Sequence, residues 1–382
     1  MRRLPGVHAV NHVVLHVRTL CGSGGGPDKT ILRSPRCMPA DAGCMLVVYL
    51  YDASTPGIDR IRREAERYAC PLVTIPDRGP LDLAVIAELR RLCKQNRVTI
   101  WHGHDHKSDA LGLLLRRMHP MRVVTTLHGY IRDTLRSKLY YHADNLALLG
   151  MDRVLAVSPA LVRHAAGKGV NPSRIRFVPN AIEIERYRYR SPVDQRAYRI
   201  GMIGRLSPEK RVDRGLRLVE QLRERGLDVT LDVIGDGPLR SELEQHAQHA
   251  RFHGWCDDVR QRLGELDLLL LTSETEGLPN AALEAMATGV PVASTAVGGV
   301  PFVLDRGGCG LLLPGDESQW PYRVATLLED VIQRQALSLA ARQRVEQHFD
   351  FRKRMQRVIS IYDELPTAMT AAMRPVGSPS LR

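Results

Sequence analysis

Apolar and polar positions follow one another along the chain in blocks that predict strands and helices in turn. Runs rich in Val, Ile and Leu, such as 45–51, 98–102 and 266–273, show little alternation, which is typical of strands buried on both faces of a sheet. The segment 82–96 repeats apolar residues at helical spacing, and a helix over 108–118 is expected to start at Ser108 as its N-cap. Repeated strand–helix units predict an α/β fold with parallel, doubly wound sheets.

The pattern is interrupted by a charged, tyrosine-rich stretch near residue 190 and restarts near residue 198. A chain of 382 residues is long enough for about two domains. We therefore predict an N-terminal domain over 1–187, a C-terminal domain over 188–350 and a flexible tail over 366–382. Because ligands of such sheets bind beyond the carboxyl ends of the strands, two doubly wound domains should enclose a cleft.

The stretch SETEGLPNAALEAMATGVP follows a predicted strand and opens a helix. Pro279 suits the first helical position, and Leu278 before it cannot act as a cap. The N–H groups from Asn280 onward would then be free for a polar or anionic ligand. Glu276 and Glu284 lie on either side of this helix start and can bind hydroxyl groups in two places, although both also fit ordinary solvated positions.

A second stretch, GRLSPEKRVD, carries Arg205 and Lys210 after a predicted strand. Two cations on one cleft rim could bind a diphosphate, with Arg supplying a planar fork and Lys a point charge. A solvated basic loop is the alternative.

A third stretch, WHGHDHKSD, places His102, His104 and His106 at alternate positions around Asp105. Three interpretations remain open at this point: a zinc site, the wall of a cleft or a contact to an acceptor, and a plain exit loop after a strand. No two aspartates in the chain are separated by one residue, so the Asp-x-Asp motif of metal-dependent sugar transfer is absent.

Net charge is uneven, at +14 over residues 1–190 and −2 over 191–382. A basic half favours an anionic partner such as a phosphate, an acidic membrane surface or nucleic acid, or it is a solvated, arginine-rich surface.

Seven cysteines without CxxC spacing argue against a disulfide framework and for a reducing compartment. The chain shows neither a signal peptide nor a long apolar run, so we expect a cytoplasmic protein, which could also bind peripherally to the inner face of the cell membrane.

Two other ligand classes fit less well. GSGGGPDKT has Asp28 where a P-loop needs glycine before its lysine, and Pro27 where the dinucleotide fingerprint needs its third glycine. A nucleic-acid-binding protein should carry a basic stripe with aromatic residues for stacking, but aromatics make up only 5% of the chain. Nucleic acid is therefore not expected as a partner.

Taken together, these stretches resemble the GT-B glycosyltransferases of family 4, which are retaining enzymes dependent on nucleotide sugars, here of the bacterial cell-surface polysaccharide type. The E-x7-E signature of that family matches Glu276 and Glu284, and GRLSPEK, VIGDGP, FHGWCDDV and STAVGGVPFVL follow in the family's order. The resemblance is strong over 198–315 and looser before residue 180, where WHGHDHKSDALG and VTTLHGY have counterparts.

The resemblance implies two Rossmann-like domains whose parallel sheets face a central cleft. The N-terminal domain would bind the acceptor and the C-terminal domain the donor, with helix 351–365 packed back on the N-terminal domain. The implied catalytic residues are Glu276, Arg205, Lys210 and His128. The implied donor contacts are Glu284, Gly277, Leu278, Pro279, Asn280 and Gly254. The implied acceptor or phosphate contacts are Gly24, Gly25, Gly26, His104 and Asp105.

The function that follows is transfer of a hexose-type sugar from a UDP-, GDP- or ADP-sugar to a lipid-linked, polysaccharide or small-molecule acceptor. The resemblance implies retention of configuration. Arg205 and Lys210 would take the place of a metal ion at the departing diphosphate, so neither metal nor cofactor is expected. The alternatives are a protein that binds nucleic acid or a membrane surface without catalysis, and a nucleotide-sugar epimerase of the same fold. The sequence makes no prediction of the oligomeric state.

Overall fold

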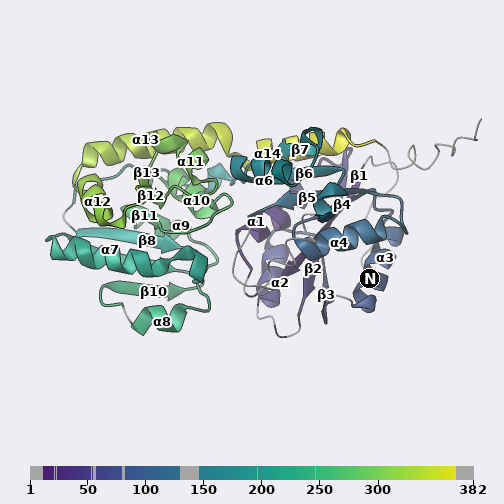
Figure 1. Ribbon diagram of the computed structural model, residues 1–382, viewed down its shortest axis with the longest axis horizontal. Helices are drawn as coiled ribbons and strands as arrows, with labels where there is room; N and C mark the ends of the chain where they lie inside the picture. Colours follow the sequence, from purple (N-terminus) through teal and green to yellow (C-terminus); the bar gives the residue numbers. More distant parts are fainter. Residues whose placement is uncertain are drawn as a thin grey trace, which may run out of the picture.

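The chain forms two α/β lobes that lie side by side along the long axis of the molecule (Figure 1). The computed structural model describes residues 12–366, apart from 21, 23, 53, 55–56, 80–81, 130–145, 196 and 246. The tail predicted over 366–382 therefore lies outside the described residues, except for residue 366.

The N-terminal lobe contains a seven-stranded parallel sheet in the order β3-β2-β1-β4-β5-β6-β7. Because the order turns back between β1 and β4, the connections leave that point in opposite directions, which opens a crevice at the carboxyl ends of these two strands. The strands are β1 (His12–Leu20), β2 (Gly43–Tyr51), β3 (Leu72–Pro76), β4 (Ile100–Gly103), β5 (Arg122–Leu127), β6 (Arg153–Ala156) and β7 (Ile175–Phe177).

The C-terminal lobe repeats this arrangement with six parallel strands in the order β10-β9-β8-β11-β12-β13. Its order turns back between β8 and β11, so the second crevice opens there. The strands are β8 (Ala197–Ile203), β9 (Asp228–Ile234), β10 (Ala250–Gly254), β11 (Leu268–Leu271), β12 (Val292–Thr295) and β13 (Leu311–Leu313). Two doubly wound parallel sheets, as predicted from the sequence, are confirmed.

Helices cover the faces of both sheets (Figure 1). Those that follow strands of the N-terminal sheet are α1 (Gly26–Arg33), α2 (Ile58–Arg67), α3 (Leu83–Gln95), α4 (His106–Leu115) and α6 (Pro159–Gly167). The later ones are α7 (Val212–Glu224), α8 (Arg240–Gln245), α9 (Arg260–Leu263), α10 (Asn280–Thr288), α11 (Val300–Val303), α12 (Trp320–Glu329), α13 (Val331–His348) and α14 (Phe351–Asp363). Short 3-10 turns lie at Ser34–Cys37, Pro172–Arg174, Ile184–Arg186, Pro208–Lys210, Asp305–Gly307 and Glu317–Gln319.

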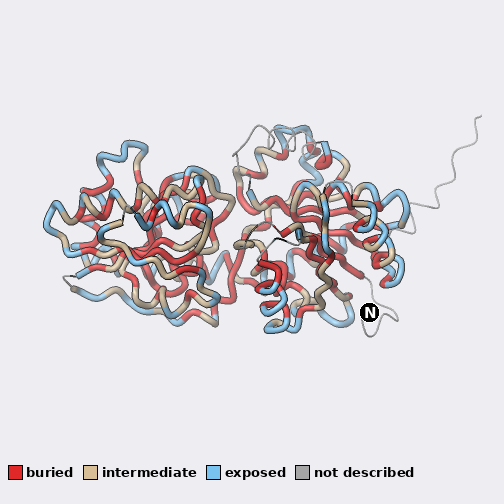
Figure 2. Tube along the Cα trace, turned by 90° about the horizontal axis from the view of Figure 1, so that it is seen from below, coloured by how far each residue is buried: buried red, intermediate tan, exposed pale blue. Residues whose placement is uncertain are grey.

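Buried residues run along the strands inside each lobe, and the outer faces of the helices are exposed (Figure 2). One continuous cluster of buried apolar side chains reaches into both lobes and includes Leu127 at the end of β5 and Leu278 before α10. This shared core holds the two crevices opposite each other, since burial of apolar area stabilises the contact by about 25 cal/mol per Å².

The last helix, α14, lies on the N-terminal sheet although it follows the C-terminal lobe in the sequence (Figure 1, yellow). Its Met355, Val358 and Ile361 pack in one buried cluster with Val14 of β1 and Val124 of β5. The chain therefore crosses between the lobes twice.

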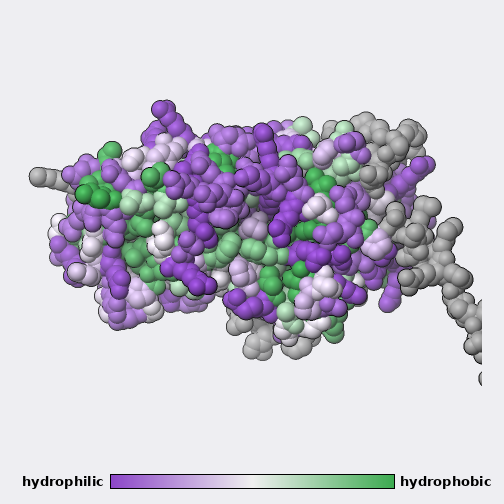
Figure 3. Space-filling model, turned by 90° about the horizontal axis from the view of Figure 1, so that it is seen from above, coloured by the Kyte–Doolittle hydropathy of each residue, from purple (hydrophilic) through white to green (hydrophobic). Residues whose placement is uncertain are grey.

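The face of the molecule seen from above is mostly hydrophilic, with apolar side chains showing between the hydrophilic ones, mainly on the C-terminal lobe and where the lobes meet (Figure 3). Among the described residues, no helix combines the length and the apolar character that crossing a membrane requires.

Candidate active site

A cleft with a volume of about 560 Å³ lies between the lobes, at the carboxyl ends of the strands where both sheets reverse. Ligand sites typically measure ~300–1,000 Å³, so this cleft has room for a nucleotide sugar. It brings together nearly all the residues predicted from the sequence. Those that line it are Gly24, Gly25, Gly26, His104, Asp105, His128, Arg205, Lys210, Glu276, Gly277, Leu278, Pro279, Asn280 and Glu284.

Gly254 is the predicted site residue that is not among the described residues lining the cleft. It ends β10 in a left-handed conformation, with φ of 69°, and the next two residues, Trp255 and Cys256, reach the cleft instead. Its contact with a donor base stays a prediction.

The start of α10 offers backbone N–H groups as hydrogen-bond donors on the C-terminal side of the cleft. The helix begins at Asn280, and Pro279 is its N-cap, in an extended conformation with ψ of 116° and without a side-chain capping bond. The prediction that Pro279 is the first helical residue was therefore wrong by one position, because its ψ is not helical. A helix start without a side-chain cap was expected and is present, so its first N–H groups remain available to a ligand.

The loops of the two lobes touch at a glycine. A Cβ atom on Gly277 would lie 1.8 Å from the backbone oxygen of His128, which is too close for any other residue. Next to this contact, the side-chain amide of Asn280 donates to the backbone oxygen of Gly26 at 3.0 Å. The glycine-rich loop, the segment after β5 and the start of α10 therefore meet on one side of the cleft.

Glu284 is 2% exposed and faces the N-terminal lobe from α10. The Lys29 ammonium donates to its Oε1 at 2.7 Å from α1 of the other lobe. Burial and the Glu284 carboxylate raise the pKa of the Tyr187 phenol. Lys29 was missed in the sequence because GSGGGPDKT was considered only as a phosphate loop. The signal that could have indicated Lys29 is its position in the first turns of a helix that follows a run of glycines.

Glu276 is paired within its own lobe. The Lys210 ammonium donates to its Oε1 at 2.6 Å, and the Ser273 hydroxyl donates to the same oxygen at 2.7 Å. The guanidinium of Arg205, by contrast, has no hydrogen-bond or ion-pair partner in the part of the chain that the structure describes, and it lines the cleft. The C-terminal wall thus offers one unpaired cation and one cation shared with a carboxylate.

The glycine-rich loop is built around a buried carboxylate. Gly24 has φ of 80°, which favours glycine, and a Cβ there would meet Asp28 Oδ2 at 2.4 Å. The Gly25 N–H donates to that oxygen at 2.6 Å, and the Arg18 guanidinium pairs with the other oxygen at 2.8 Å. Asp28 is fully buried and its charge is balanced, so it shapes the loop at the start of α1.

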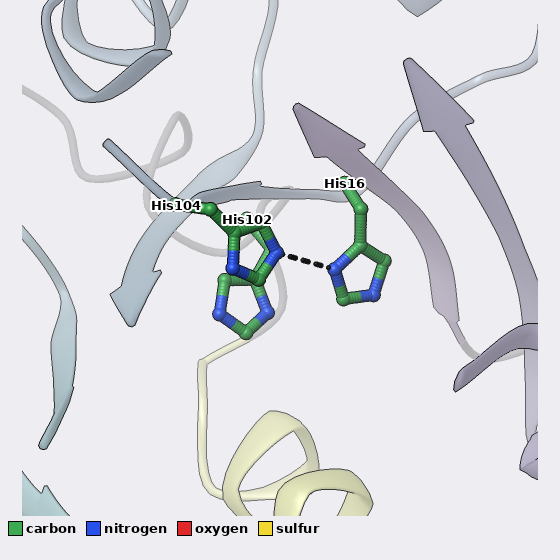
Figure 4. Close-up of side chains that lie close together, drawn as sticks. All are labelled: His16, His102 and His104. Carbon is green, nitrogen blue, oxygen red and sulfur yellow. Dashed lines mark hydrogen bonds between the residues drawn. The ribbon is translucent and has the colours of Figure 1, made fainter. Parts of the chain in front are cut away.

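The histidines of the stretch WHGHDHKSD lie in two different places, a buried cluster and the start of α4. His102 and His104 lie with their rings nearly parallel, 4.6 Å apart between centroids, and His16 of β1 joins them (Figure 4). His106 instead starts α4 and is exposed. Sequence reasoning missed His16, because only the pairing of His16 with His102 on neighbouring strands brings the two segments together.

Asp105 is the N-cap of α4, and the prediction that Ser108 caps this helix was wrong. The carboxylate of Asp105 accepts from the N–H groups of Lys107 and Ser108 at 3.1 and 3.0 Å, and from the N–H of Thr19 at 2.7 Å. Asp105 therefore fixes the ends of β1 and β4 while it lines the cleft. A contact between Asp105 and an acceptor stays a prediction.

The three clustered histidines invite comparison with a metal site, since one nitrogen of each of His16, His102 and His104 lies within 4.8 Å of the others. A ligating imidazole must direct a ring lone pair at the ion. Both ring nitrogens of His102 are instead hydrogen-bonded, to the Tyr362 hydroxyl at 2.6 Å and the Thr126 hydroxyl at 2.7 Å. The residues present therefore fit a hydrogen-bonded network better than a metal ion.

Burial keeps these rings uncharged. Burial and, to a lesser extent, Arg354 lower the pKa of His16 to about 3. Burial is also the largest cause that lowers the pKa values of His102, His104 and His128 well below the usual range. At neutral pH the N-terminal wall of the cleft is consequently lined by neutral imidazoles.

A second contact between the lobes was also missed. The Arg60 guanidinium of α2 lies 4.4 Å from the ring centroid of Trp255, which follows β10, and both residues line the cleft. A cation over an indole face typically contributes ~0.5–2 kcal/mol. Trp255 lies one residue after Gly254, so the indole is an aromatic surface at the edge of the cleft where that glycine was expected to contact a base.

Two sequence families match the two lobes. Residues 25–181 match the family described as "Glycosyl transferase 4-like domain", and residues 197–330 match the family described as "Glycosyl transferases group 1".

Among curated relatives, N-acetyl-alpha-D-glucosaminyl L-malate synthase of Bacillus anthracis is 28% identical over 308 residues, which is 75% of this chain and 79% of that protein. UDP-Gal:alpha-D-GlcNAc-diphosphoundecaprenol alpha-1,3-galactosyltransferase of Escherichia coli is 23% identical over 74% of this chain and 80% of its own length. The crystal structure of Anabaena HepE in complex with UDP-glucose aligns with a TM-score of 0.77 at 20% identity, covering 92% of this chain and 100% of that one.

Proposed function

The chain belongs to the GT-B glycosyltransferases of the family 4 type, and on that premise we propose that it transfers a hexose-type sugar from a nucleoside diphosphate sugar to a sugar or lipid-linked acceptor. The observation that carries the proposal is the composition of one cleft of about 560 Å³. Cations from the loops after β8 face the uncapped start of α10, and a buried carboxylate lies in the second turn of the same helix.

The proposed donor position follows from these groups. Arg205, which lacks a protein partner among the described residues, is free to bind the diphosphate. Lys210 already donates to Glu276, and its ammonium has further N–H groups that can donate to a phosphate oxygen. Glu284 is contacted by Lys29 at Oε1 and by the Tyr187 phenol, and a carboxylate has further lone pairs that can accept from the hydroxyl groups of a ribose.

The chemistry expected there is cleavage of the bond between the sugar and the diphosphate. Negative charge develops on the leaving diphosphate, and the sugar becomes positively polarised. Preorganised cations and backbone N–H groups stabilise the leaving charge, and loss of one such group typically costs ~10²–10³ in rate. We propose that the cations supply this stabilisation without a metal ion and that the sugar retains its configuration.

The relatives support a UDP-sugar as the first donor to test. The Escherichia coli relative is named for UDP-Gal and a diphosphoundecaprenol-linked acceptor, and HepE is described in complex with UDP-glucose. The net charge of +14 over residues 1–190 supports an acceptor carried at an anionic membrane surface. Co-sedimentation with vesicles containing anionic lipid, at low and high salt, checks that part of the proposal.

A panel of UDP-, GDP- and ADP-sugars tests the donor assignment, with thermal shift as the first measurement and calorimetry as the second. One nucleotide series should stabilise the wild-type chain, and Arg205→Ala should bind the same sugar about a hundredfold more weakly. Glu274→Gln is the control, because Glu274 is exposed on the loop between β11 and α10 and pairs with Arg211 outside the residues that line the cleft. Binding by none of the sugars, or equal binding by Arg205→Ala, would refute the proposal.

A further inference from the structure

Four histidines lie where β1, β4 and β5 reach the cleft, and the proposed function gives none of them a role. Val14, Ile100 and Val124 face α14 in one apolar cluster. Because side chains alternate along a strand, residues two and four positions further on face the same side. These positions hold His16, Arg18, His102, His104, Thr126 and His128.

Three of these rings are joined in a line. His16 Nδ1 and His104 Nε2 share a hydrogen bond of 2.9 Å, and His104 Nδ1 and His128 Nε2 share one of 3.0 Å. The ring planes differ by only 16° and 29°, so the imidazoles meet edge to edge. His102 lies against His16 and His104 with its ring nearly parallel to both, but its nitrogens bond to hydroxyl groups instead.

The bonding in this line couples the three rings. A neutral imidazole has one N–H donor and one bare nitrogen. If His128 donates through Nε2, then His104 must accept at Nδ1 and donate through Nε2 to His16. If His16 donates through Nδ1, every bond reverses. The three rings therefore share one tautomer, either all Nε2–H or all Nδ1–H.

The two ends of the line are His16 Nε2 and His128 Nδ1, and both are buried without a hydrogen-bond partner in the part of the chain that the structure describes. His128 and His104 line the cleft, whereas His16 is not among the described lining residues. A buried nitrogen without a hydrogen-bond partner destabilises the folded state unless a ligand or water forms that hydrogen bond. The end at His128 is the one beside the proposed donor position.

We propose that His16 and His104 are positioning residues that fix the tautomer of His128, so that Nδ1 of His128 presents a lone pair to a hydroxyl group of the bound sugar. The identity of the ligand rests on the proposed function, whereas the coupling of the rings does not. The direction follows from charge. Burial, then Arg18 and Arg354, lower the pKa of His128, whereas burial and Arg354 lower that of His16. With two cations acting on it, the His128 end of the line is the better place for the unpaired lone pair, and the His16 end then carries the N–H.

The test is ¹⁵N NMR of the full chain with labelled histidine, which distinguishes Nδ1–H from Nε2–H imidazole. We expect His16, His104 and His128 to be Nε2–H at neutral pH. His16→Asn keeps an amide near the position of Nδ1 and should leave His104 and His128 as Nε2–H. His16→Leu removes the partner and should convert them to mixtures. His249→Leu is the control, since His249 pairs with Glu220 away from the cleft.

Kinetics with UDP-glucose provide the second measurement. We expect kcat of His16→Leu to fall about tenfold with little change in KM, and His16→Asn to restore it to within about threefold. Different tautomers on the three rings, a charged ring among them, or stoichiometric zinc binding that removes their N–H signals would overturn the inference. A chain with coupled tautomers but no transfer from any nucleotide sugar would reject the proposed function and leave the coupling intact.

Discussion

Replacement of Glu284 by glutamine isolates the charge of the carboxylate that we place on the donor ribose. The amide keeps the size of the side chain, which is 2% exposed in α10, and removes its negative charge. A hydrogen bond to a charged group contributes ~1.5–3 kcal/mol, against ~0.5–1.5 kcal/mol for a neutral one. Two ribose hydroxyl groups would therefore lose about 2–3 kcal/mol in total, which corresponds to a loss in affinity of about 30- to 150-fold.

The effect on folding should be small. Lys29 loses the ion pair of 2.7 Å, but its side chain is 26% exposed and can turn to water, so we expect a loss of about 1 kcal/mol in the free energy of unfolding. Calorimetric titration with UDP measures the affinity, and urea denaturation measures the stability. Glu274→Gln is the matched control, with a side chain that is 53% exposed on the loop before the same helix. Affinity within threefold of wild type in a folded Glu284→Gln chain would refute the reasoning.

Three further predictions follow from other parts of the molecule. Gly277→Ala should abolish transfer, because its Cβ would lie 1.8 Å from the backbone oxygen of His128, whereas Gly315→Ala, with open space around its Cβ, should retain activity in the same assay. The folded state should become less stable below pH 6.5, because the unfolded chain binds a proton there that His16 in the folded chain, with its pKa lowered to about 3, does not bind. Urea denaturation at pH 7.5 and 5.5 should show that this residue lowers the free energy of unfolding by up to about 1.4 kcal/mol per pH unit, and a higher free energy of unfolding at pH 5.5 would contradict the prediction. Transfer should persist in excess EDTA, and complete loss that a divalent ion restores would show that the cations of the cleft do not suffice.

Much of the fold could be predicted because its signals are local. Buried runs such as LVVYL and LLLL, each followed by a helical period, are sufficient to indicate two parallel sheets. The spacing of Glu276 and Glu284 around an uncappable helix start located the C-terminal wall of the cleft. The error at Pro279 was one residue, since a proline accepts both the N-cap and the first helical position.

The N-terminal wall was harder because its parts come together only through pairing of strands. His16 and His102 are 86 residues apart in the chain and become neighbours in the register of β1 and β4. Lys29 and Arg60 reach the other lobe only after the two lobes are packed with their crevices opposite each other. Asp105 was misjudged because it competes with Ser108 for the same helix start, and only the backbone geometry decides between them.

The central claim is that cations and a helix start hold the diphosphate while a buried carboxylate holds the ribose. A crystal structure of the full chain with bound UDP tests it most directly. The claim predicts phosphate oxygens within hydrogen-bond distance of Arg205 and Lys210, and ribose hydroxyl groups on the carboxylate of Glu284. A nucleotide bound elsewhere, or one whose phosphates turn away from both cations, would contradict it.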